Sequence, residues 1–138
     1  MIPIIEVEGI LVVPVQETLH DRLALDLQHR LGDEIAHSNP RGVIIDISTV
    51  EVLDSFIARV LDQIGQKCLL MGLQTVVVGM QPAVAMTLVE MGMDLAFVHT
   101  ALNINSAMRL FYTLDYTGEA EEAPEREVDQ QGLMEENG

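Results

Sequence analysis

The chain has 138 residues, 49% of them hydrophobic, and a formal net charge of −15. This length supports one domain with a sizeable core and is too short for two. The acidic balance excludes binding to nucleic acid or to an anionic membrane, because those surfaces attract basic patches, and it favours a protein partner or a cationic ligand. Cys68 is the single cysteine and cannot form an internal disulfide, and no basic leader follows Met1, so we expect a cytoplasmic protein.

The first forty residues predict a hairpin followed by a long helix. Residues 4–14 form two short β-branched runs on either side of Glu8-Gly9, a pattern that favours a hairpin. An apolar residue then recurs at every fourth position, at Leu19, Leu23, Leu27, Leu31 and Ile35. This spacing predicts an amphipathic helix with Thr18 as its N-cap. The helix must end before Pro40, because the residue before a proline is disfavoured in the helical conformation.

The rest of the chain alternates between strands and helices. Strands are predicted at residues 42–47, 74–79 and 95–98, and helices from Ser55, from Pro82 to about 91–92, and over residues 103–112. The uncharged stretch at residues 68–89 is long enough to span a membrane, but its Gly, Gln and Pro residues and its change of period indicate a strand between helices. Residues 1–117 therefore predict a single α/β domain, with a mostly parallel mixed sheet, an N-terminal hairpin and about four helices.

The composition changes at Gly118. The segment at residues 118–138 has Arg126 as its one basic residue and almost no large apolar side chains. Its acids are Glu119, Glu121, Glu122, Glu125, Glu127, Asp129, Glu135 and Glu136. Such a segment buries too little apolar surface to offset the entropy of ordering, so we expect a disordered acidic tail.

No catalytic or nucleotide-binding motif occurs in the sequence, which argues against an enzyme and predicts no cofactor. Cys68 is interpreted as a small buried apolar residue rather than a nucleophile. The scattered histidines His20, His29, His37 and His99 lack the spacing of a metal site, so none is predicted. The methionines, including Met71, Met80, Met86, Met91 and Met93, are interpreted as core residues rather than a binding face.

The junction between the strand at residues 42–47 and the following helix is the candidate site. Asp54 and Ser55 lie where a parallel strand leads into a helix, which is where open α/β sheets bind ligands and partners. A helix cap explains the same residues, because Asp or Ser at the N-cap accepts a hydrogen bond from an orphan backbone N–H. Local chemistry leaves both interpretations open.

A family resemblance favours the functional interpretation. The Val52-Leu53-Asp54-Ser55 turn, the helix after it and the run from Gly72 to Gly79 resemble the STAS domain over residues 2–115. The more specific run from Asp54 to Arg59 resembles stressosome scaffold proteins of the RsbS type. Anti-sigma factor antagonists of the same family usually continue this turn as Asp-Ser-Ser-Gly-Leu, and Phe56-Ile57 departs from that pattern.

The resemblance implies a non-catalytic scaffold in the stress response, a phosphoprotein that assembles with itself and with sensor-bearing STAS paralogues. It would hold a serine/threonine switch kinase and release it when Ser55 is phosphorylated, with Asp54, Phe56 and Arg59 contacting the partner. Thr87 lies where sensor-bearing relatives carry a second phosphorylated threonine, although a helical threonine that bonds its own backbone explains it equally well.

Two alternatives stay open at this stage. The first keeps the fold and changes the partner: a small anti-sigma factor antagonist that binds an anti-sigma kinase and frees a sigma factor. The second is a hydrolase that uses Cys68 or a histidine, and it would require a reactive thiol.

Overall fold

The N-terminal hairpin is formed as predicted. In the computed structural model, which describes residues 1–16 and 18–120, strand β1 (Ile5–Val7) pairs antiparallel with β2 (Ile10–Pro14). Glu8 and Gly9 between them have φ values of 52° and 80°. Two successive positive φ values are typical of the type I′ turn, whose twist matches that of the strands it joins.

A five-stranded mixed sheet in the order β1-β2-β3-β4-β5 follows from the alternating elements. Strands β2 to β5 are parallel, with Val43 opposite Leu11 and Thr75. The remaining elements are α1 (Asp21–Ser38), β3 (Gly42–Asp46), α2 (Ser55–Leu70), β4 (Gln74–Val78), α3 (Pro82–Glu90), β5 (His99–Ala101) and α4 (Ile104–Ala120). The predicted fold class, a mostly parallel sheet with an N-terminal hairpin and four helices in the described residues, is confirmed.

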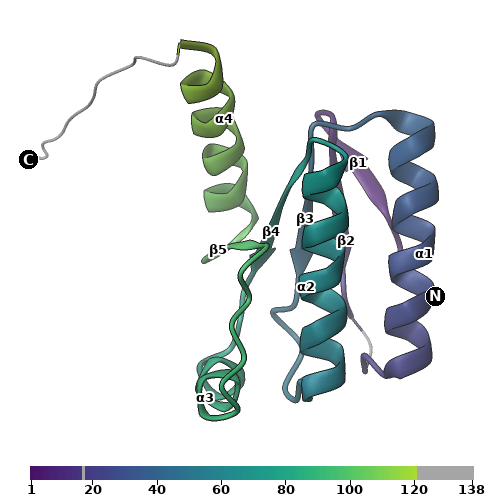
Figure 1. The fold of residues 1–138 in the computed structure, drawn as a ribbon, viewed down its shortest axis with the longest axis vertical. Helices are drawn as coiled ribbons and strands as arrows, with labels where there is room; N and C mark the ends of the chain where they lie inside the picture. Colours follow the sequence, from purple (N-terminus) through teal and green to yellow (C-terminus); the bar gives the residue numbers. More distant parts are fainter. Residues whose placement is uncertain (17, 121–138) are drawn as a thin grey trace, which may run out of the picture. The chain divides into compact units, whose positions relative to one another are not determined.

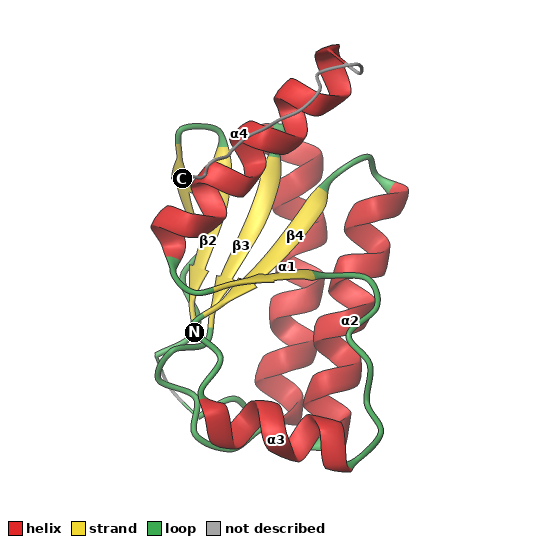
Figure 2. Ribbon diagram, turned by 90° about the vertical axis from the view of Figure 1, so that its left-hand side faces the viewer, coloured by secondary structure: helices red, strands yellow, loops and turns green. Residues whose placement is uncertain are grey.

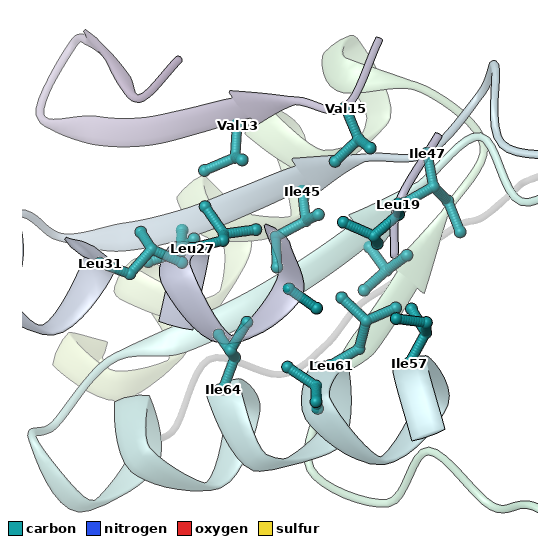
Figure 3. Close-up of a cluster of buried hydrophobic side chains, with 14 of the residues drawn as sticks. Val13, Val15, Leu19, Leu27, Leu31, Ile45, Ile47, Ile57, Leu61 and Ile64 are labelled. Atoms are coloured by element: carbon teal, nitrogen blue, oxygen red, sulfur yellow. The ribbon is translucent and has the colours of Figure 1, made fainter. Parts of the chain in front are cut away.

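The main core lies between the sheet and helices α1 and α2. The two helices run side by side (Figure 1), and a view turned by 90° shows them on the same side of strands β2, β3 and β4 (Figure 2). Val13 and Ile45 of the sheet point toward Leu27 of α1 and Leu61 and Ile64 of α2 (Figure 3). These side chains are buried, and burial of apolar surface of this kind supplies the main favourable term in folding.

The structure corrects the start of the first helix and the position of the last strand. Helix α1 begins at Asp21, and its N-cap is His20, whose Nδ1 accepts from the Leu23 N–H at 3.4 Å; the prediction of Thr18 was wrong. The last strand is His99–Ala101 rather than residues 95–98, because the backbone N–H of Phe97 donates to Asp62 of α2 at 2.9 Å instead of to the sheet.

Helix α4 was predicted to end near Tyr112 but continues to Ala120. Residues 1–107 form one compact unit, and a second begins at Met108. The helix therefore includes the first residues of the predicted acidic tail, whose remainder, residues 121–138, lies outside the described residues.

The methionines divide into two groups. Met80 and Met93 pack against the core, as predicted. Met71, Met86 and Met91 are 47%, 63% and 39% exposed, so their assignment to the core was wrong. Met71 and Met91 lie just after the ends of α2 and α3, and Met86 lies on an exposed side of α3. The sequence in these regions is too uniformly apolar to show which side chains face water. In the described part of the chain, no helix is long and apolar enough to cross a bilayer.

Candidate functional site

The loop between β3 and α2 is held at the carboxyl edge of the sheet by three side-chain hydrogen bonds. Asp46 Oδ1 accepts from the Ser48 N–H at 2.9 Å, and Gln81 Nε2 donates to the Ser48 carbonyl at 2.9 Å. Thr49 Oγ1 donates to the carbonyl of Val15 at 2.8 Å. Sequence analysis overlooked these anchors, although the Asp-x-Ser spacing directly after a strand is typical of an Asx turn.

Close approach of the next strand also fixes this loop. Gly79, just after β4, has φ of +77°, and a Cβ there would lie 2.7 Å from Cβ of Ser48. Only glycine adopts this conformation without strain and leaves room for the loop. The start of α2 is thus positioned by contacts from the residue after β2, from β3 and from the segment after β4.

Asp54 performs the capping. Its backbone is extended (φ −86°, ψ 176°), and its Oδ1 accepts from the N–H of Ile57 at 2.9 Å. Ser55 is the first residue of the helix, is half-buried, and its hydroxyl has no hydrogen-bond partner among the described residues. The capping interpretation therefore accounts for Asp54 and leaves the Ser55 hydroxyl without a structural role.

The other predicted partner-binding residues differ in accessibility. Arg59 is exposed one helical turn after Ser55, whereas Phe56 is half-buried and packs against the core. Val52, just before the helix, is 81% exposed and adds an apolar side chain at the same end. The structure thus brings Asp54, Ser55 and Arg59 together at the exposed start of α2, and Phe56 contributes mainly to packing.

Thr87 lies on a different element. It is exposed on α3, and its hydroxyl donates to the carbonyl of Ala83 at 2.9 Å. This i to i−4 bond is the structural role that the sequence analysis left open for a helical threonine.

Two hollows open at the same edge of the sheet. One, of about 510 Å³, is lined by the β2–α1 and β3–α2 loops, including Thr18, Glu51 and Val52. The other, of about 360 Å³, is lined by the ends of β3 and β4 and by residues 102–105 after β5, and it includes Asp46, Ser48 and Asn103. Within the described residues, no group of three or more His, Cys, Asp or Glu side chains is placed to hold a metal ion.

Cys68 is buried, as predicted, with 1% of its surface exposed. Burial raises the pKa of its thiol, and the hydroxyl of Thr75 opposes this effect only in part. A raised pKa keeps the thiol neutral, whereas a nucleophilic cysteine needs the thiolate. The environment of Cys68 therefore argues against this thiol as the nucleophile of the hydrolase alternative.

The burial of Cys68 predicts slow alkylation of its thiol and a stability of the fold that depends on pH. We expect native Cys68 to react with N-ethylmaleimide at least about a hundredfold more slowly than in the urea-unfolded chain. The thiol of the unfolded chain ionises near its ordinary value of 9.0, and the folded thiol ionises higher. The stability that Cys68 contributes is therefore fully present below pH 9.0 and declines as the pH rises toward the folded value. Urea unfolding measured at several pH values should show this decline in the free energy of unfolding for the wild-type chain and not for Cys68→Ala. Equal declines in the two proteins would contradict the prediction.

Comparison with known proteins identifies the class. Residues 1–107 match the family model of the STAS domain, and this match covers the sheet, helices α1 to α3 and the Asp54-Ser55 turn. The chain belongs to the STAS domain family.

Two solved structures refine the assignment. A serine-to-glutamate variant of Moorella thermoacetica RsbS is 39% identical, with a TM-score of 0.73, over 83% of this chain and 97% of that one. A chain from a structure described as the molecular architecture of the stressosome is 42% identical, with a TM-score of 0.72, over 82% of this chain and 98% of that one. Over most of its described length, the chain is therefore similar to RsbS and to a chain of the stressosome structure.

A curated relative gives a third comparison. The RsbT co-antagonist protein RsbRA of Bacillus subtilis (strain 168) is 31% identical over 99 residues, which are 71% of this chain and 36% of the relative. The chain thus spans about a third of the length of the curated relatives that it matches.

Proposed function

We propose that this chain is a non-catalytic stressosome scaffold that holds a serine/threonine switch kinase and releases it when Ser55 is phosphorylated. The observation that carries the proposal is the Ser55 hydroxyl, which has no hydrogen-bond partner within residues 1–16 and 18–120, beside a capping Asp54 at the exposed start of α2. A hydroxyl that the fold does not use can accept a phosphoryl group without the loss of a structural hydrogen bond.

Electrostatics supports both the survival of the fold and the release. Phosphorylation adds about −1.5 to −2 charges, and a helix N-terminus favours anions, so α2 stays folded. Asp54 and Glu51 are exposed near Ser55, so the phosphate adds to negative charge already present. A kinase face that is acidic or apolar at this point would then meet like charge or a costly desolvation, and the complex would weaken.

The matches to RsbRA and to the stressosome structure support a proposal for the assembly partners. This chain matches 36% of the RsbT co-antagonist protein RsbRA and covers 98% of a chain from the stressosome structure. We propose that the chain assembles with copies of itself and with longer, sensor-bearing proteins of that kind, and that the unphosphorylated assembly holds the kinase.

Phosphate mapping tests the site. After incubation with the cognate kinase and ATP, we expect mass spectrometry to place one phosphate on Ser55 and to find none after Ser55→Ala. Thr87 is monitored in the same digest as the second candidate, and Thr87→Ala serves as the matched control that leaves Ser55 available. Phosphate that appears only at other residues would contradict the proposal.

An anti-sigma factor antagonist remains the second candidate, because the same free serine at a helix start would serve an anti-sigma kinase equally well. Phe56-Ile57 at the turn disfavours it, since that group usually continues as Asp-Ser-Ser-Gly-Leu. Size-exclusion chromatography with light scattering separates the two, because a scaffold enters very large assemblies with STAS paralogues whereas an antagonist stays small.

A further inference from the structure

Arg59 is an exposed cation that the fold does not use. Within the described residues it makes no hydrogen bond or ion pair, whereas Lys67, the other cation of α2, donates to Gln28 Oε1 at 3.2 Å. Asp62, three residues further along the helix, accepts from the Phe97 N–H through its Oδ1 and makes no ion pair with Arg59 in the described residues. The guanidinium of Arg59 is therefore available to a group from outside the fold.

The helix places Arg59 next to Ser55. Residues four apart on an α-helix are neighbours on its surface, and both lie away from the buried stripe that includes Ile57, Leu61 and Ile64. Asp54 already occupies the N–H of Ile57, so that donor is not available to a phosphate on Ser55. Arg59 is then the cation within reach, with a planar fork of donors that matches phosphate oxygens.

We propose that Arg59 is the switch residue of this site: it pairs with a carboxylate of the kinase while Ser55 is unmodified, and it pairs with the phosphate of Ser55 afterwards. This inference rests on the proposed function and adds its mechanism. Phosphorylation then acts twice, because it adds negative charge at the start of α2 and withdraws the positive charge that the partner needs. The partner surface is accordingly acidic where it meets Arg59.

The phosphate itself reports the pairing without any kinase. With phosphoserine installed at position 55 by genetic code expansion, a ³¹P NMR titration gives the second pKa of the phosphate. A neighbouring cation favours the dianion, so Arg59→Gln should raise this pKa by about 0.3. Lys67→Gln is the matched control, because it removes the same charge from the same helix about 18 Å away and should leave the value unchanged. A phosphate pKa that is the same before and after the Arg59→Gln substitution would overturn the phosphate pairing.

Binding of the cognate kinase tests the other half. In the unphosphorylated chain, Arg59→Gln should weaken kinase binding by about two- to fivefold in calorimetry, and Lys67→Gln should not. Unchanged affinity would overturn the docking role of Arg59. Failure of the proposed function is distinguishable from either result, because it appears as kinase affinity that is the same with serine and with phosphoserine at position 55.

Discussion

Replacing Gly65 with alanine should lower the free energy of unfolding by about 2 kcal/mol, although alanine is the better helix former. Gly65 lies in the middle of α2, and a Cβ there would collide with the carbonyl oxygen of Phe97 and lie 2.6 Å from Cγ1 of Val98. The obstacle includes backbone, so it cannot be removed by rotation of a side chain. Overpacking of this kind costs about 1–3 kcal/mol, near the upper end here, and the helix propensity of alanine returns about 1.

Gly32 provides the matched control. It is also a helical glycine, in α1, but nothing lies within 4 Å of a Cβ built there. Gly32→Ala should therefore stabilise the protein by about 0.5–1 kcal/mol. Urea unfolding of the two variants should give opposite signs, and a stabilising Gly65→Ala would contradict the close packing of residues 97–98 against α2.

The packing of residues 97–98 against α2 also explains why one strand could not be located from the sequence. The hairpin and the start of α2 were predictable because their signals are local: a turn at Glu8-Gly9, and two residues suited to a helix start, Asp54 and Ser55. The position of β5 was not predictable, because it depends on a hydrogen bond between Asp62 and Phe97, two residues that are far apart in the sequence. Periodicity alone places residues 95–98 in a strand, whereas long-range contacts hold them against α2.

The candidate site shows the same division. The sequence placed Asp54, Ser55 and Arg59 at one strand-to-helix junction, and the structure brings them together. It could not show which of Asp54 and Ser55 caps the helix, since both residue types are good caps. Nor could it show that Phe56 is half-buried against the core, because an apolar residue in the first turn of a helix can face either way.

Replacing Ser55 with aspartate should weaken kinase binding at least about tenfold while the fold survives. The new carboxylate lies at the first position of α2, where the helix dipole favours negative charge, so stability should be unchanged or raised by about 0.3–1 kcal/mol. The same charge lies beside Asp54 at the exposed start of the helix. Repulsion between like charges, or burial of a charge at the interface, costs enough to weaken kinase binding about tenfold.

Two measurements on the same variants separate a switch from structural damage. Ser55→Ala should keep both the unfolding midpoint and the kinase affinity, because the Ser55 hydroxyl makes no hydrogen bond within the described residues. Calorimetry should then show that only Ser55→Asp loses affinity for the kinase. Urea unfolding should show that neither variant loses stability. Unchanged affinity with aspartate would count against release by charge. Loss of stability with either substitution would instead mean that Ser55 supports the fold, because neither change removes the cap that Asp54 provides.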